Sequence, residues 1–304
     1  MITSPVTGLS NVKLNKKIDS SDIIIRYKRD FDIDVGKYFE GKTQVYIYEC
    51  LDTGFLFFSP EGMAGDESFY DELKIQMPVK YNVPYYSEDK WEYGVCAEYI
   101  EPGNKVYEIG AGNGAFLRKL IDKQVTDVFG SELNHYSIKT ALEKGIKLEY
   151  KTIEERAEVN ETLYDVVCTF QVLEHVSHVK SFLDSAIKIL KPGGKLMIAV
   201  PFNNPYLFGY DVLNTLNLPP HHMGLWNKQV FQKIPFFYPL KLENIIIEDL
   251  AGGGYDFDQF YKINKDRFFA FLPYRKFVDK IYRKFLRKYH HKFHGKNIIA
   301  IYKV

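Results

Sequence analysis

The sequence has few cysteines and no long apolar run. Its 304 residues include three cysteines, Cys50, Cys96 and Cys168. An odd number of widely spaced cysteines excludes a disulfide framework and favours a reducing compartment. No run approaches the roughly 20 apolar residues that cross a bilayer, and the first residues lack the apolar core of a signal peptide. These absences predict a cytoplasmic protein.

The chain also lacks an overall charge of one sign, because its formal net charge is +1. The charges are nevertheless distributed unevenly. Residues 271–304 carry ten Lys or Arg and one Asp, whereas the remainder carries 30 basic and 38 acidic residues. An acidic body with a basic tail does not favour a nucleic-acid partner for the main part of the protein.

The basic tail has a helical pattern of apolar residues. Within residues 273–293 they recur at every fourth position, at Phe277, Ile281, Phe285 and Tyr289. Lysines and arginines lie between them, so we predict an amphipathic helix with a cationic face. Such a helix suits contact with an anionic membrane surface, although packing on the protein's own sheet and nucleic-acid binding are alternatives.

The spacing of apolar segments divides the chain into regions. Residues 1–88 form an N-terminal extension without a regular pattern, and residues 89–304 form the core, with a substrate-covering insertion at 203–235. In the core, predicted strands alternate with helices at short intervals, at residues 105–109, 125–132, 147–151, 164–169 and 195–200. This alternation predicts a doubly wound, mostly parallel α/β sheet, and we expect residues 295–304 to add an antiparallel edge strand.

A glycine-rich turn follows the first core strand. Gly110, Gly112 and Gly114 allow a tight turn and a close approach to a ligand, and such turns lie where open α/β sheets bind ligands. The pattern also fits a dinucleotide fingerprint, which alone is weak. Glu108 favours S-adenosylmethionine instead, because a carboxylate repels a pyrophosphate but attracts an ammonium and a sulfonium group.

A second acidic residue lies at the end of the next predicted strand. Glu132 follows Gly114 by 18 residues. A carboxylate at this position is able to accept hydrogen bonds from both ribose hydroxyls of a nucleoside. Both cofactor hypotheses predict such a residue, so Glu132 supports a nucleoside ligand without distinguishing between them.

These residues resemble the class I S-adenosylmethionine-dependent methyltransferases. The resemblance covers residues 91–201 and rests on EIGAGNG at 108–114, Glu132, YDVVCTFQVLEHV at 164–176 and LKPGGKLMIAVP at 190–201. It implies a seven-stranded Rossmann-like sheet and S-adenosylmethionine as cofactor. The N-terminal region resembles leader segments of bacterial glycan and natural-product methyltransferases. Some of these carry a Cys-x-x-Cys pair there. Here Thr53 stands at the position of the second cysteine, three residues after Cys50, which does not favour a zinc site.

The resemblance also implies which residues hold the cofactor. The glycine loop would hold the methionine part, and the loop after the second strand would hold the ribose. The segment after the third strand would flank the adenine, although the Asp-Ala pair usual there is absent. The positions implied for the cofactor are Glu108, Gly110, Ala111, Gly112, Gly114, Glu132, Leu133, Ile153, Glu154 and Gln171.

Aromatic residues before the core suggest a lid over the cofactor. Tyr85, Tyr86 and Trp91 are close in sequence, and a cation–π contact between an aromatic ring and a sulfonium is physically reasonable. Core packing of the extension is the alternative explanation for these rings. We include Tyr86 and Trp91 among the predicted cofactor contacts.

Three histidines are the candidate catalytic residues. His175 follows the fourth core strand, and His221 and His222 lie in the insertion, where we expect adjacent histidines to point in different directions. We predict that His221 or His222 acts as a base with help from His175; capping or packing roles are the alternatives. Trp226 is a candidate platform for a sugar or ring.

The sequence does not favour a metal site. Some similar methyltransferases bind a divalent metal through Glu-x-x-Glu-His and a later histidine. Here Gln171 replaces the first glutamate, and an amide is a poorer metal ligand than a carboxylate. We therefore predict no metal.

The preferred function is S-adenosylmethionine-dependent O-methylation of a sugar, glycan or small molecule. Two other hypotheses remain from the sequence. One is an NAD(P)-dependent oxidoreductase that uses the same glycine loop. The other is a non-catalytic module whose basic tail binds a membrane or nucleic acid.

Overall fold

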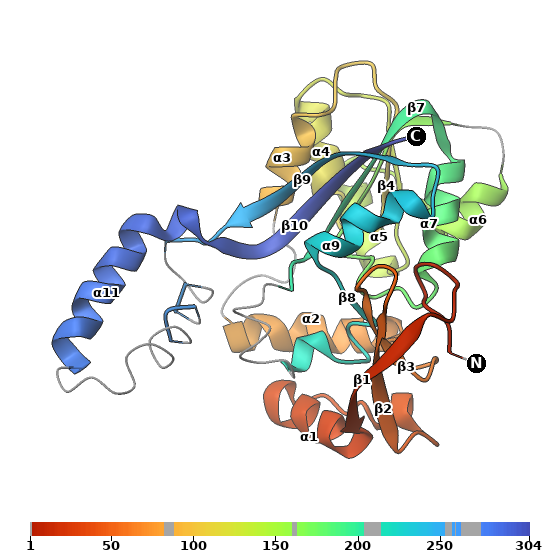
Figure 1. The fold of residues 1–304 in the computed structure, drawn as a ribbon. Coiled ribbons are helices and arrows are strands. Elements are labelled where there is room, and N and C mark those ends of the chain that lie inside the picture. Colours follow the sequence, from red (N-terminus) through yellow and green to blue (C-terminus); the bar gives the residue numbers. More distant parts are fainter. Residues whose placement is uncertain are drawn as a thin grey trace.

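The computed structural model describes residues 2–81, 88–159, 163–203, 214–252, 257–258, 260–262 and 275–304. Its larger sheet has the strand order β5-β4-β6-β7-β10-β9 (Figure 1). These strands are β4 (Val106–Ile109), β5 (Val128–Ser131), β6 (Tyr164–Phe170), β7 (Leu190–Pro201), β9 (Lys241–Asp249) and β10 (His294–Lys303). Strands β5, β4, β6 and β7 are parallel, which confirms the predicted α/β fold.

Two predicted strands differ from the observed sheet. Residues 147–151 form an isolated parallel bridge between Glu149 and Ser131 rather than a strand, with backbone hydrogen bonds to Gly130 and Glu132. Strand β10 is antiparallel as predicted, but it lies between β7 and β9 rather than at the edge. The edge is formed by β9, which the sequence analysis did not predict.

Helices cover both faces of this sheet because its strands are apolar on both sides. In β7, Leu196 and Ile198 belong to one hydrophobic core and Met197 and Ala199 to the other. One face carries α3 (Trp91–Ala97), α4 (Ala115–Asp122) and α5 (His135–Glu143). The opposite face carries α6 (Ile153–Glu158), α7 (Val179–Lys188) and α9 (Lys228–Lys233), the last followed by η3 (Ile234–Phe236).

The N-terminal extension is regular, contrary to the sequence-based expectation. It contains β1 (Val12–Asp19), α1 (Ser20–Phe31), η1 (Gly36–Phe39), β2 (Gln44–Cys50), β3 (Leu56–Ser59) and α2 (Glu67–Tyr81). In β2, Val45 and Ile47 are buried while Tyr46 and Tyr48 are partly exposed. Because tyrosine is itself largely apolar, this alternation was concealed in the sequence.

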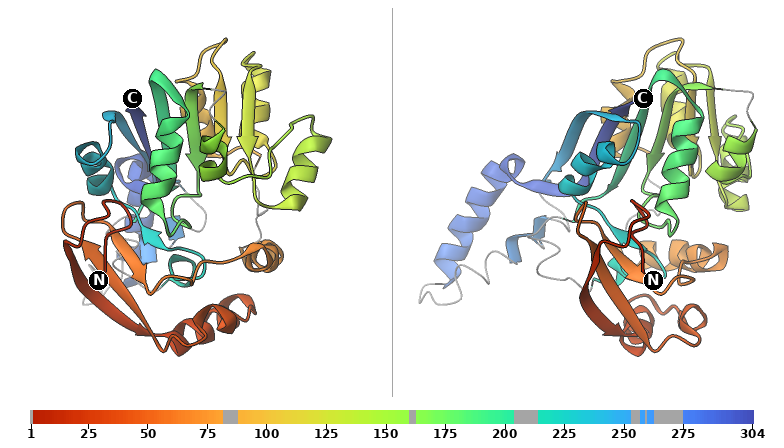
Figure 2. Two further views of the ribbon diagram at one scale, coloured as in Figure 1. Left: turned by 90° about the vertical axis from the view of Figure 1, so that its right-hand side faces the viewer. Right: turned by 45° about the vertical axis from the view of Figure 1, so that its right-hand side comes forward.

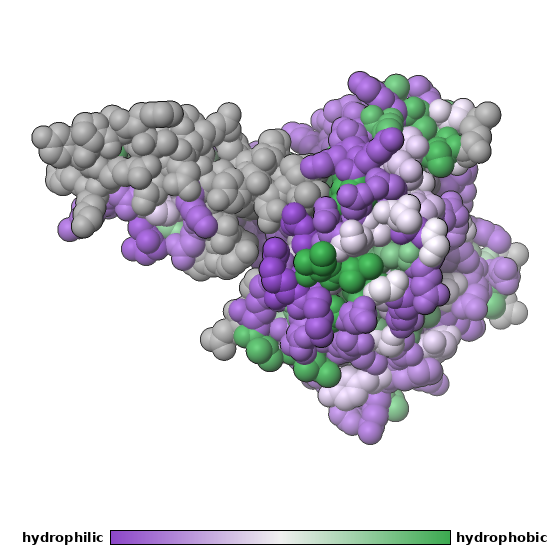
Figure 3. All heavy atoms as spheres, turned by 90° about the horizontal axis from the view of Figure 1, so that it is seen from below, coloured by the Kyte–Doolittle hydropathy of each residue, from purple (hydrophilic) through white to green (hydrophobic). Residues whose placement is uncertain are grey.

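The insertion belongs structurally with the extension. Strand β8 (Gly224–Leu225) pairs with β3 and completes a second sheet of order β1-β2-β3-β8. The short η2 (Thr215–Asn217) precedes it, and Leu218, Met223 and Leu225 join the hydrophobic core of the extension. Figure 2 shows these elements gathered below the large sheet, and Figure 3 shows their underside as hydrophilic surface interrupted by apolar patches.

The predicted tail helix is present as α11 (Arg275–Tyr289), followed by η4 (His290–Lys292). It extends away from the body of the protein (Figures 1 and 2). Leu286 is fully buried against Phe257, Phe260 and Tyr261. Among the described residues, no helix is both long and apolar enough to cross a membrane.

Candidate active site

A cavity of about 1080 Å³ lies at the carboxyl ends of β4, β5 and β6. Its walls come from the glycine loop, from the loops after β5 and β6, from α2 and from the insertion. This is the edge where open α/β sheets bind ligands. The predicted positions that line it are Trp91, Gly110, Ala111, Gly112, Glu132, Leu133, Ile153, Glu154, Gln171, His175, His221 and His222.

The glycine loop has the backbone conformation that its composition predicts. Gly110, Gly112 and Gly114 have φ angles of 71°, 53° and 75°, which other L-residues rarely adopt. A Cβ atom on Gly110 would lie 2.5 Å from Cγ2 of Val172. The loop therefore packs closely on Val172 and forms its cradle only with glycine at position 110. Gly114 is the N-cap of α4 and does not line the cavity.

Glu132 holds two loops together. Its Oε2 accepts the Gly112 N–H at 2.8 Å, and its Oε1 accepts the N–H groups of Leu133 and Asn134 at 2.8 and 2.9 Å. A carboxylate has about four acceptor positions, so it still has capacity for a ligand hydroxyl. The residue predicted to bind ribose thus also fixes the shape of the glycine loop.

Glu108 lies directly behind the cavity wall rather than in it. It is 1% exposed, and its Oε2 has no hydrogen-bond partner in the described part of the chain. Burial raises its pKa well above the usual value, the Glu132 carboxylate raises it further, and Lys90 opposes the shift. A buried acceptor without a partner is costly. The ammonium group of S-adenosylmethionine would supply the missing partner of Glu108.

The predicted adenine side of the cavity begins at α6. Ile153 and Glu154 form its first turn, which Thr152 and Glu155 cap reciprocally. Tyr150 also lines the cavity and stacks on His135 with ring centroids 4.3 Å apart. The sequence analysis missed Tyr150, although its position at the end of a predicted strand was a signal.

Gln171 closes the opposite side of the glycine loop. Its φ of 58° is left-handed, and its Nε2 donates to Glu92 Oε1 at 3.2 Å and to Asn297 Oδ1 at 3.3 Å. Trp91 lies nearby in the cavity wall. Tyr85 and Tyr86, the other predicted lid residues, lie outside the described residues.

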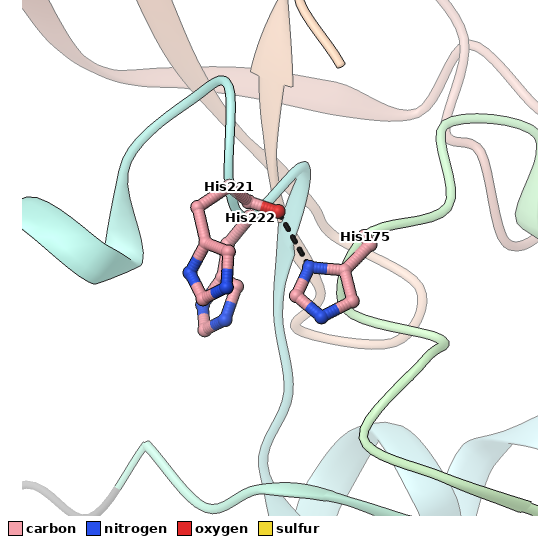
Figure 4. A group of neighbouring side chains, drawn as sticks. All are labelled: His175, His221 and His222. Carbon is pink, nitrogen blue, oxygen red and sulfur yellow. Dashed lines mark hydrogen bonds between the residues drawn. The ribbon is translucent and has the colours of Figure 1, made fainter. Parts of the chain in front are cut away.

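The three predicted histidines lie side by side (Figure 4) and all line the cavity. The ring centroid of His175 lies 4.7 Å from that of His221 and 5.1 Å from that of His222. Nδ1 of His175 lies 2.6 Å from the His221 carbonyl oxygen, and Nδ1 of His221 lies 2.9 Å from the Leu216 carbonyl oxygen. The rings of His221 and His222 are stacked 4.4 Å apart, so the expectation that adjacent histidines diverge is wrong.

Burial favours the neutral form of these imidazoles. It lowers the pKa of His175 to about 4 and that of His221 to about 3, and it lowers the pKa of His222 well below its usual value. Beside them, burial raises the pKa of Glu174 to about 8. A neutral imidazole has one ring nitrogen with a free lone pair, which can accept a proton or coordinate a metal ion.

Trp226 does not form the expected platform. Its side chain is fully buried, with ring centroids 4.6 Å from Phe55 and 5.2 Å from Phe231. It packs the extension against the core. An indole ring buried in this way has no face left for a sugar.

Helix α2 is the part of the site that the sequence analysis missed. It contributes Glu67, Tyr70, Lys74 and Met77 to the cavity wall. Asn134, beside the predicted ribose position, donates to carboxylate oxygens of α2 at 3.1 and 3.3 Å. No local signal marks these residues, because only the fold brings α2 against the core.

Together, the parallel sheet, the glycine turn and the acidic residue after β5 define an α/β protein that binds a nucleoside-containing ligand. A family model described as a methyltransferase domain matches residues 89–246. This segment is more than half of the chain, so the protein belongs to that family. The prediction of a class I S-adenosylmethionine-dependent methyltransferase is confirmed, and S-adenosylmethionine is the cofactor of this family.

Individual relatives match the core. The ubiquinone biosynthesis O-methyltransferase of Aliivibrio fischeri is 39% identical over 114 residues, covering 35% of this chain and 48% of its own. The protein of the same name from Hahella chejuensis is 29% identical over 136 residues, covering 42% and 57%. The chain thus spans about half the length of the curated relatives that it matches.

A solved structure extends the likeness in fold. An S-adenosylmethionine-dependent methyltransferase from Archaeoglobus fulgidus superposes with a TM-score of 0.50 at 16% identity, covering 76% of this chain and 99% of its own. This likeness shows the fold alone.

Proposed function

We propose that this protein transfers the methyl group of S-adenosylmethionine to a hydroxyl group of a sugar or small-molecule acceptor. One observation carries the proposal: a single cavity is lined by the glycine loop, by Glu132 and by the three histidines. The O-methyltransferase names of the relatives support an oxygen acceptor. Family membership argues against the NAD(P)-dependent and non-catalytic alternatives.

Different residues would bind the cofactor, enclose the acceptor and remove its proton. S-adenosylmethionine supplies a methyl group already activated by a sulfonium. Glu132 and the glycine loop would hold the nucleoside and methionine parts, while α2 and the insertion enclose the acceptor. One imidazole of the cluster accepts the hydroxyl proton, so that the oxygen can form its new bond to carbon.

Calorimetric titration tests this proposal directly. We expect saturable binding of S-adenosylmethionine and S-adenosylhomocysteine but not of NAD. The Glu108→Gln variant should bind both ligands at least about tenfold more weakly, because a hydrogen bond to a charged group contributes about 1.5–3 kcal/mol. The exposed Glu98→Gln is the matched control. Binding of NAD alone would contradict the proposal.

The raised pKa of Glu108 gives the titration a pH dependence. Burial raises the pKa of the Glu108 carboxyl, and pairing with an ammonium group would favour the ionised form, so binding should release protons wherever the free carboxyl is still protonated. Affinity should therefore rise with pH in the wild type, and this rise should be absent in Glu108→Gln.

We further propose that α11 rests on an anionic membrane surface, which would bring the enzyme to a lipid-linked or lipid-soluble acceptor. Ile281 and Phe285 are 54% and 51% exposed, one helical turn apart, among the exposed Lys280, Lys284 and Lys288. The neighbouring Leu286 points elsewhere and is buried in the cluster with Phe257, Phe260 and Tyr261. Cations beside exposed apolar side chains fit anionic lipid rather than another surface of this chain.

Sedimentation with vesicles tests this contact. We expect binding to vesicles of phosphatidylcholine with phosphatidylglycerol, and none to phosphatidylcholine alone. Replacing Ile281 and Phe285 together by serine should remove it, since each buried side chain contributes about 1.5–3 kcal/mol. Ile75→Ser with Val79→Ser on α2, apolar positions that are 67% and 79% exposed, is the control. Equal loss in both variants would contradict a specific role for α11.

A further inference from the structure

The three histidines of the cavity form a cluster with the properties of a metal centre. One ring nitrogen from each of His175, His221 and His222 lies within 4.8 Å of the other two, and Figure 4 shows the His175 ring beside the overlapping rings of His221 and His222. We infer that these histidines form a binding site for a divalent transition-metal ion such as Zn²⁺ or Co²⁺.

The hydrogen bonds fix which nitrogens are free. A carbonyl oxygen can only accept, so Nδ1 of His175, 2.6 Å from the His221 carbonyl oxygen, must carry the proton. The same holds for Nδ1 of His221, 2.9 Å from the Leu216 carbonyl oxygen. In a neutral ring the lone pair is then on Nε2. Metal-ligating histidines characteristically donate their other N–H to a backbone carbonyl or carboxylate in this way.

The surroundings of the cluster complete this pattern. Glu174 is 2% exposed, its Oε1 lies 3.7 Å from Nε2 of His175, and its Oε2 has no hydrogen-bond partner in the described part of the chain. A cation bound beside Glu174 would favour its ionised form, and the free oxygen would then be able to accept a hydrogen bond from a metal-bound water. The cluster therefore has both ligands and an outer acceptor.

The donor set selects the kind of ion. Three imidazoles suit Zn²⁺ or Co²⁺, whereas Mg²⁺ prefers oxygen ligands. With Zn–N bonds of about 2.0–2.1 Å, tetrahedral ligand atoms lie about 3.3 Å apart. Binding would have to bring the nitrogens about 1.5 Å closer at their widest and turn His221 or His222 out of the stack, in which their ring planes lie 19° apart. Three protein ligands leave a fourth position open, as in catalytic zinc sites.

The three-histidine set differs from the Glu-x-x-Glu-His pattern, which places a ligand at position 171. There, Gln171 in place of a glutamate argued against a metal. The structure shows that Gln171 is bonded to Glu92 and Asn297. The three-histidine set therefore does not depend on the residue at position 171.

The role of the ion, though not its binding, rests on the proposed function. In the metal-loaded protein the imidazoles are ligands and cannot also accept a proton. The acceptor hydroxyl would instead occupy the open position, where the cation lowers its pKa and the proton leaves to water. The cluster could thus promote deprotonation of the acceptor hydroxyl in either of two ways, with a histidine as base or with a bound ion.

Cobalt titration tests the site without any turnover. The whole chain, without a histidine tag and after chelator treatment, is titrated with Co²⁺ and followed by visible absorption. We expect the intense bands of tetrahedral cobalt to saturate at one ion per chain and to disappear when Zn²⁺ is added, whereas Mg²⁺ should not displace the ion. Absence of these bands together with no calorimetric Zn²⁺ binding overturns the inference, whatever the variants do.

Matched variants locate the ion. Alanine at His175, His221 or His222 should each weaken Zn²⁺ binding by more than the roughly 10- to 100-fold that loss of an outer partner costs. His178→Ala removes an exposed histidine three residues away and should have no effect. The tail carries His290, His291 and His294, so a triple alanine variant there is a second control. Loss of binding in that variant but not in the cavity variants overturns the inference.

Activity then separates the ion from the proposed function. If chelation stops methyl transfer and Zn²⁺ restores it, the ion prepares the acceptor. If Co²⁺ and Zn²⁺ bind but no acceptor is methylated, the metal site stands and the proposed function fails.

Discussion

Gly110→Ala is expected to lower kcat/KM for methyl transfer by roughly 100-fold, the effect of misplacing a reacting group by about 1 Å. Alanine at a φ of 71° is strained, by about 1–2 kcal/mol. Its Cβ would also lie 2.5 Å from Val172 Cγ2. The loop must shift away from the position that Glu132 fixes through the Gly112 N–H. Steady-state kinetics and S-adenosylhomocysteine titration measure the effect.

Two further variants separate the clash from the backbone strain. Gly145 has a φ of 78° and nothing within 4 Å of a Cβ, so Gly145→Ala carries the same strain away from the cavity and should keep its activity. Removing the opposing methyl groups in Gly110→Ala/Val172→Ala should restore part of the loss. If Gly110→Ala and Gly145→Ala bind S-adenosylhomocysteine equally well, the cradle has no role in binding.

Joint replacement of His175, His221 and His222 by alanine is expected to reduce kcat by about 10²–10⁴-fold, the contribution of a positioned acid or base. S-adenosylhomocysteine affinity should change less than kcat, because the variant leaves Glu132 and its hydrogen bond to the glycine loop intact. Single-turnover kinetics with an acceptor that the wild type methylates measure the loss. Unchanged turnover would refute both the base and a catalytic ion.

Conservative variants guard against a folding defect. His222 is 5% exposed, so alanine there leaves a cavity, whereas His222→Gln keeps most of the volume but cannot accept a proton at neutral pH. Added imidazole should restore part of the activity of an alanine variant if a histidine is the base. Restoration by Zn²⁺ alone in the chelated wild type indicates the metal instead.

The cofactor side of the cavity was predictable because its residues are encoded locally. A strand, a glycine turn and a helix follow one another within about twenty residues, so Gly110 and Gly112 could be assigned from their order alone. Predicting that Glu132 lies near this turn required only one further assumption, that the next strand lies beside the first. The parallel pairing of β4 with β5 has that arrangement.

The other end of the cavity was less predictable because distant segments form it. His175 and His221 are 46 residues apart, and their contact depends on β8 pairing with β3 of the extension. The sequence suggested the three histidines but not that the rings of His221 and His222 stack. It also could not distinguish a platform at Trp226 from a core residue, since a tryptophan fits both until its neighbours are known.

The sequence by itself therefore determined the fold class, the family and the cofactor loop. Hydrophobic periodicity and glycine conformation act over a few residues, so they can be read without knowing the rest of the chain. Only the tertiary structure decided that α2 forms a wall of the cavity, that β10 lies inside the sheet and that three histidines share one space. These features arise from burying apolar faces of segments far apart in the chain, a long-range choice that no single segment encodes.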